Sequence, residues 1–130
     1  MSGYDCHHAP QDILAERKAI AERVCRELES AGLPAFRLGE GEGEWEGAAV
    51  TVDSGGDAAG GVAVSWKCAL GRAAAERLLA GDVQARVIQQ SGVVSQHMQQ
   101  AIIGLLRAAG MDADTDEDDM NPLAVRVVSR

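Results

Sequence analysis

The first pattern in the chain is a hydrophobic residue at every third or fourth position from residue 10 to residue 31. This spacing places one apolar stripe on an α-helix and leaves the charged residues mostly elsewhere; the stripe consists of Ile13, Ile20, Val24, Leu28 and Ala31. Gly32 can adopt the left-handed conformation that ends a helix, and Pro34 cannot continue one. We therefore predict a helix over residues 10 to 31, with one face in the core.

Apolar and polar residues alternate in three later stretches, over residues 49–52, 62–68 and 123–128. A period of two is typical of a strand with one buried face. The Gly-rich and Asp-containing segment 54–60 separates the first two stretches, which predicts a β-hairpin. A shorter extended piece is expected at residues 35–38, before the hairpin.

Helical spacing returns from Leu70 to Gly81 and again from Gly92 to Ala109. The segment 83–90 fits both a helix and a strand, and we favour a helix. In the last helix one predicted face is formed by Val94, Met98, Ala101, Ile102, Leu105 and Ala109. Ile103 points to the opposite side and Leu106 lies between, so this helix is apolar on more than one side.

Two interpretations of Ile103 and Leu106 remain open. In the first, the last helix lies between the sheet and another helix. In the second, Ile103 and Leu106 contact a second subunit and the protein is a homodimer.

The order of these elements predicts a single α+β domain over residues 10–130, preceded by a flexible N-terminus at residues 1–9. Its expected order is roughly α-β-β-β-α-α-β, with a small antiparallel sheet of three to four strands and the helices packed on one face. The final strand is expected at an edge of that sheet.

The charge of the chain is concentrated in two segments. The formal net charge is −8; residues 40–57 hold six acidic residues and no basic one, and so do residues 112–119. We predict acidic loops at 39–47 and 112–121. An acidic chain is a poor binder of nucleic acid, because Lys and Arg supply most of the affinity for phosphates. There is also no apolar run of about 18 residues and no secretory signal pattern at the start, so a cytoplasmic protein without membrane association is expected.

The chemistry-bearing residues predict neither a cofactor nor a metal site. Cys6, His7 and His8 form the densest group of metal-capable side chains, but no CxxC or HxxxH spacing presents two of them together. The run from Asp112 begins like a calcium-binding loop, yet Glu117 and Leu123 stand where such a loop needs Gly and a bidentate Glu.

These features favour a non-enzymatic binding or adaptor module that presents acidic loops to a protein partner with a basic surface. Trp45, an aromatic residue flanked by Glu44 and Glu46, either anchors its loop onto the domain's own surface or contacts a partner. The predicted contact residues are Trp45, Glu44, Glu46, Asp116, Asp118 and Asp119. The alternative is a small-ligand- or metal-binding protein, with or without enzymatic activity, whose pocket lies near Trp66, Cys68 and His97.

Overall fold

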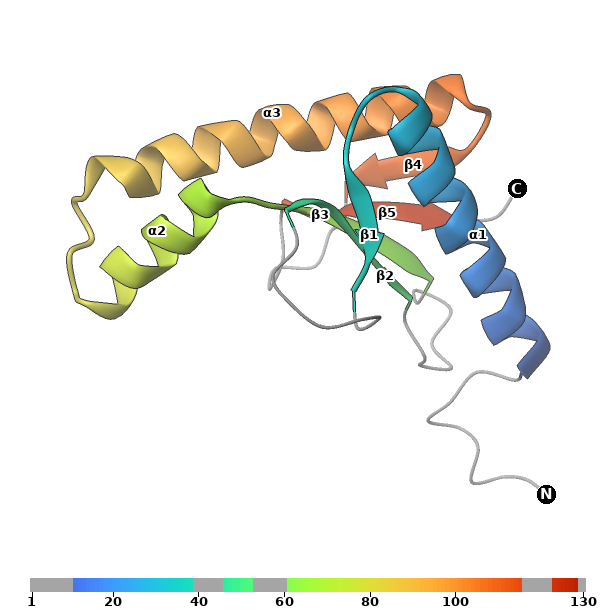
Figure 1. Ribbon diagram of the computed structural model, residues 1–130, viewed down its shortest axis with the longest axis horizontal. Helices are drawn as coiled ribbons and strands as arrows, with labels where there is room; N and C mark the ends of the chain where they lie inside the picture. The colour runs from blue at the N-terminus through green and yellow to red at the C-terminus, as the bar shows by residue number, and fades with distance from the viewer. Residues whose placement is uncertain (1–10, 39–45, 53–60, 116–122, 129–130) are drawn as a thin grey trace.

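The protein folds as an α+β domain with three helices and a five-stranded mixed sheet, as Figure 1 shows. The computed structural model describes residues 11–38, 46–52, 61–115 and 123–128. Along the chain the elements are α1 (Gln11–Ser30), β1 (Ala35–Arg37), β2 (Gly47–Val52), β3 (Val62–Lys67), α2 (Ala69–Leu79), α3 (Arg86–Ala108), β4 (Asp112–Thr115) and β5 (Val125–Val128). The predicted fold class is therefore confirmed. The predicted N-terminal segment 1–9 lies outside the described residues.

Helix α1 begins and ends close to where its sequence pattern predicts. Its buried residues are Ala21, Val24 and Leu28, which lie on the predicted apolar face. Gly32 has a φ of 95°, and the amide of Leu33 donates to the carbonyl of Leu28 at 2.9 Å. This is the left-handed glycine that terminates a helix and satisfies one of its last carbonyls.

The sheet has the strand order β1-β2-β3-β5-β4, and β1 pairs with β2 in parallel while all other pairs are antiparallel. The predicted hairpin is β2–β3, with Val50 opposite Val64. Three expectations were wrong. The sheet has five strands rather than three to four, it is mixed rather than antiparallel, and β5 lies inside it rather than at an edge, because β4 covers its outer side.

Strand β4 replaces the first part of the predicted acidic loop at 112–121. Its burial pattern explains why hydrophobic alternation did not predict this strand: Ala113 is buried, whereas Asp112, Asp114 and Thr115 are exposed. An edge strand with one small buried residue carries almost no hydrophobic signal, and its charges discourage pairing with another strand.

Helices α1 and α3 cover one face of the sheet, and the core lies between these two layers. The strand register aligns Val50, Val64 and Val125 in one row on this face. From the helices, Leu28 and Leu106 complete the core, and both are fully buried. The rows between point to the opposite face and carry small or polar residues, among them Thr51, Ala63, Arg126 and Asp114.

Helix α3 includes most of the segment 83–90 that the sequence left ambiguous. Residues 86–90 form its first turns and residues 83–85 precede it, and there is no break at Ser91 and Gly92. Its C-terminal half lies along the sheet, whereas its N-terminal half extends beyond the sheet and packs against α2 (Figure 1). We call residues 69–98 the arm and the rest of the described chain the body. No helix in the described part of the chain is both long and apolar enough to cross a membrane.

Candidate interaction surface

The arm buries very little of its own apolar surface. Within it, Ala74 is the one buried hydrophobic residue of the described set. Four of the six exposed large hydrophobic side chains in the described part of the chain lie between residues 78 and 93: Leu78, Leu79, Val83 and Val93. Leu79 is 90% exposed. Apolar side chains gathered in this way are typical of a surface that binds another molecule.

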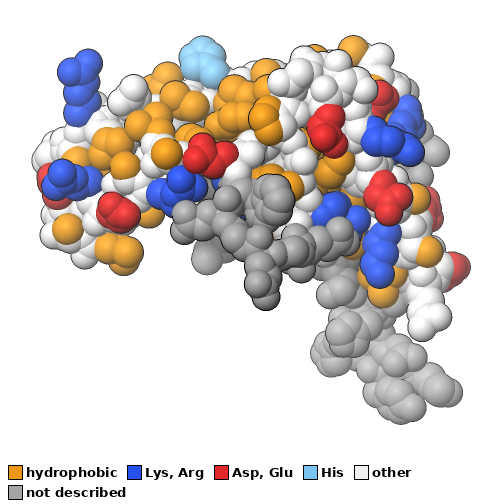
Figure 2. Space-filling model, in the orientation of Figure 1, with side chains coloured by type: hydrophobic (Ala, Val, Ile, Leu, Met, Phe, Trp, Pro, Cys, Tyr) orange, Lys and Arg blue, Asp and Glu red, His pale blue; other side chains and the backbone are white. Residues whose placement is uncertain are grey.

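A second group of side chains, apolar except for one serine, follows one side of α3. We call this group the outer stripe; it consists of Val87, Ser91, Val94, Met98, Ala101 and Leu105. Ala101 is exposed and the other five are partly buried, Ser91 beside Gly71 of α2 and Leu105 against the core. Figure 2 shows hydrophobic side chains gathered over α3 and the arm on the side facing the reader.

The structure divides the predicted core face of α3. Ile102 is buried in the core and Leu105 and Ala109 pack against it, as expected, whereas Val94 and Met98 are only partly buried and Ala101 is exposed. Ile103 and Leu106 also lie in the core, with exposed fractions of 5% and 0%. These two residues cannot form the predicted surface for a second subunit, because they are already packed in the core of the chain.

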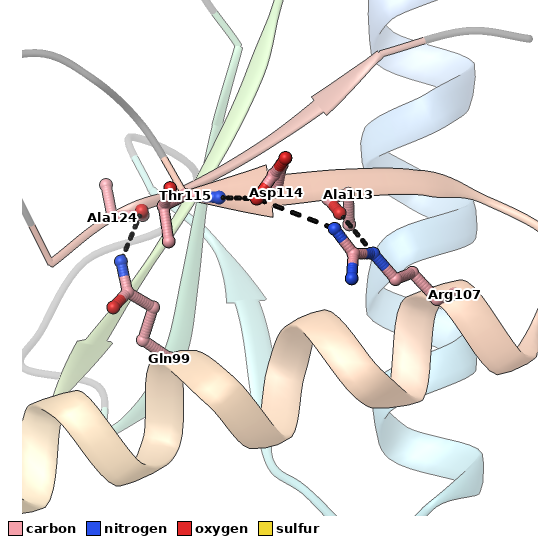
Figure 3. Close-up of polar contacts among 6 residues, drawn as sticks. All are labelled: Gln99, Arg107, Ala113, Asp114, Thr115 and Ala124. Carbon is pink, nitrogen blue, oxygen red and sulfur yellow. Dashed lines mark hydrogen bonds and ion pairs between the residues drawn. The ribbon is translucent and has the colours of Figure 1, made fainter.

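Two polar side chains fix the sheet-facing side of α3 (Figure 3). The buried side chain of Gln99 donates from Nε2 to the carbonyl of Ala124 at 3.0 Å. In the last turn of the helix, Arg107 donates from Nε to the carbonyl of Ala113 at 2.8 Å and lies 3.5 Å from the carboxylate of Asp114. The position of Gln99 between Met98 and Gln100 gave no sequence signal for burial, since amides are mostly exposed.

The middle of α3 carries no acidic or basic side chain. From Val87 to Leu106 there is no Asp, Glu, Lys or Arg. Charged residues are depleted at the centres of protein interfaces, where burial would remove them from water. The outer stripe therefore has the composition of an interface centre.

Most of the predicted contact residues lie outside the described residues, namely Trp45 and the acidic residues Glu44, Asp116, Asp118 and Asp119. Glu46 is described and exposed, and its carboxylate accepts a hydrogen bond from the guanidinium of Arg72 at 3.2 Å. This contact joins the body to α2 of the arm. Asp112 and Asp114 add two exposed carboxylates on the edge strand β4.

The predicted ligand pocket near Trp66, Cys68 and His97 is not supported by the exposure of these residues. His97 is exposed on α3, Trp66 is partly buried against the core, and Cys68 precedes α2 without a capping hydrogen bond from its side chain. An open pocket of about 250 Å³ lies instead between α1 and the strand ends, with Ile20 and Arg23 on one side and Met111 on the other.

In the described part of the chain, no group of three or more His, Cys, Asp or Glu side chains could hold a metal ion. Cys6, His7 and His8 lie outside that part. No family model matches the sequence, and no curated protein or solved structure matches it either.

Proposed function

We propose that the protein is a non-enzymatic protein-binding module whose contact surface is the arm. The observation that carries this proposal is the concentration of exposed apolar side chains in residues 78–93 beside an uncharged, partly covered stripe on α3. Single exposed hydrophobic residues are ordinary, but a contiguous apolar surface on a small domain is typical of a binding site.

The energetics of the arm support the same function. Helix α2 has 11 residues, and an isolated helix shorter than about 12 residues is marginal in water without tertiary packing. Its packing comes mainly from α3, against which Gly71 and Ser91 allow a close approach. A partner that covers the apolar side chains of both helices would supply the burial that this two-helix hairpin lacks.

The acidic segments form a second part of the proposal. Glu46, Asp112 and Asp114 are exposed carboxylates next to the acid-rich segments 39–47 and 112–121. Opposite charges steer a partner toward the correct surface and raise its association rate. We therefore expect a protein bound at these segments to present Lys and Arg, while the arm supplies the apolar contact.

A photo-crosslinking amino acid at position 79 tests the arm directly. Leu79 is 90% exposed, so the replacement does not disturb the core. Irradiation of cells that produce this variant is expected to link the chain to protein. The matched control is the same amino acid at Glu29, which is exposed on α1 of the body. Equal yields at both positions, or no protein adduct at position 79, would contradict the proposal.

A further inference from the structure

We infer that the arm binds the arm of a second copy of this chain, with the two α3 helices antiparallel about a twofold axis near Gly92. This inference rests on the proposed function and names the partner. Three observations carry it: the spacing of the outer stripe, the distribution of charge, and the size of the surface.

The outer stripe has the spacing of a helix that pairs with another helix. Its members follow one another at intervals of four, three, four, three and four residues from Val87 to Leu105. Val87, Val94 and Ala101 recur at intervals of seven residues, and so do Ser91, Met98 and Leu105, which is the heptad repeat of helices that pair along one seam. A helix that only covered a sheet would need no such second seam, and α3 already contacts the sheet through Ile102, Ile103 and Leu106.

The part of the seam on the arm is also complementary to itself. Residues 87, 91, 94 and 98 are symmetric about a point between Gly92 and Val93. When two copies run antiparallel about that point, Val87 lies opposite Met98 of the second copy, and Ser91 lies opposite its Val94. A twofold interface requires this property, because each contact occurs twice with the roles exchanged. Ser91 lies at the border of the seam, where its Oγ faces Gly71 of α2 in the same chain, so the second copy contacts the seam mainly through Val87, Val94 and Met98.

Charge favours a second copy over other partners at this surface. The chain carries a net charge of −8, so two copies repel each other wherever their acidic surfaces meet. From Val87 to Leu106 there is no charged residue to repel. The antiparallel arrangement also places the two acidic bodies at opposite ends of the dimer. A strongly basic partner would find no acidic side chain on the stripe to pair with.

The size of the surface sets the expected strength. Residues 87–98 span about 18 Å of helix, and the arm is about two helix diameters, or 20 Å, wide. These dimensions give a face of about 360 Å², which is smaller than the roughly 800 Å² per partner of a standard specific interface and is in the range of weak, transient contacts. We therefore expect a dimer with a micromolar dissociation constant, which appears and disappears within the concentration range of ordinary solution measurements.

Sedimentation equilibrium of the full chain tests the inference. The wild-type protein is expected to pass from monomer to dimer as its concentration rises through the micromolar range. Two variants each place a charge on the seam, Val87→Lys and Met98→Glu, and each should raise the dissociation constant at least tenfold. The control Gln100→Glu adds the same charge as Met98→Glu at an exposed position of α3 outside the stripe and should dimerise like the wild type.

Mixing the two seam variants separates a lost interface from a lost fold. In the inferred register the lysine introduced at position 87 of one chain would face the glutamate introduced at position 98 of the other. An equimolar mixture of Val87→Lys and Met98→Glu should therefore form a heterodimer. Circular dichroism of each variant alone reports whether the monomer is folded. A folded pair of variants that remains monomeric when mixed would overturn the register.

A wild type that stays monomeric at every concentration would overturn the second copy as partner. The crosslinking experiment at position 79 then tests separately whether the arm binds any protein. Adducts with a different protein would keep the arm as a binding surface, whereas no adduct with any protein would remove both.

Discussion

The body and the arm use hydrophobic residues in opposite ways. In the body, strands and helices close around a core in which Leu28, Ile102 and Leu106 are at most 1% exposed. In the arm, which has a similar share of apolar residues, Ala74 alone among the described hydrophobics is buried. Two layers can enclose a core, but two helices side by side cannot. The difference indicates that the arm is completed by another molecule.

Helix α3 belongs to both regions, which makes it the link between them. Its C-terminal half is held to the body by core packing and by the side chains of Gln99 and Arg107. Its N-terminal half packs mainly against α2. A substitution in the N-terminal half should therefore alter association, and a substitution in the C-terminal half should alter stability. Substitutions in the body should therefore lower stability more than substitutions in the arm, and the largest difference is expected between two leucines.

Removing a leucine side chain should have very different effects in the two regions. Leu106→Ala in the body should lower the free energy of unfolding by about 3 kcal/mol, because a fully buried side chain leaves a cavity. Leu79→Ala in the arm should change it by less than about 0.5 kcal/mol in the monomer. Urea denaturation of both variants at low concentration measures this contrast. Similar losses would show that the arm contributes to the core.

Gly47→Ala should break the junction between α1 and the sheet. Gly47 has a φ of 125°, and a Cβ atom there would lie 2.9 Å from the carbonyl carbon of Pro34. The combined backbone strain and overlap should cost about 2 kcal/mol or more. Gly104→Ala is the matched control, since a Cβ at Gly104 meets nothing within 4 Å and alanine is the better helix former. Thermal denaturation should show the control unchanged or slightly stabilised.

Gln99→Ala should loosen the end of α3 that lies on the sheet. The buried carbonyl of Ala124 would lose its donor, which costs about 1 to 2 kcal/mol. Gln100→Ala, at the exposed neighbouring position, should change the unfolding free energy by less than about 0.5 kcal/mol. Equal effects of the two substitutions in urea denaturation would mean that the hydrogen bond does not hold the helix.

Arg72→Ala should have the smallest effect. Its ion pair with Glu46 connects α2 to the body at 3.2 Å, but the side chains are 41% and 56% exposed, so solvent screens the attraction. We expect a change of less than about 0.5 kcal/mol in the unfolding free energy, together with faster amide exchange in α2. A larger loss of stability would show that the arm and the body fold as one unit.

Sequence patterns predicted where the helices and strands lie better than they predicted which side of each element is buried. The end of α1 at Gly32 and the hairpin of β2 and β3 followed from local signals that act within a few residues. The faces of α3 did not, because periodicity identifies an apolar stripe without showing what covers it. Ile102 lies in the core as its position in the stripe predicted, but Ile103 and Leu106 lie there too, whereas Val94 and Met98 of the same stripe are only partly buried.

Sequence patterns did not predict the edge strand of the sheet or the candidate surface, and each omission has a physical reason. Strand β4 is formed by Asp112 to Thr115, where pairing with β5 and the hydrogen bond from Arg107 replace hydrophobic alternation. In the sequence, Leu78, Leu79 and Val83 resemble ordinary helix and turn residues, since their exposure depends on α2 lying away from the sheet. The position of α2 relative to the sheet is known only from the three-dimensional structure.

Hydrogen–deuterium exchange of the wild-type protein at two concentrations tests the central claim most directly. If a second copy covers the arm, the amides of residues 69–98 should exchange more slowly at high concentration than at low concentration. Those of the body, such as Val64 in β3 and Leu28 in α1, should exchange at the same rate in both. Arm amides that exchange identically at both concentrations, and as slowly as those of the body, would show that the arm needs no partner and would contradict the account.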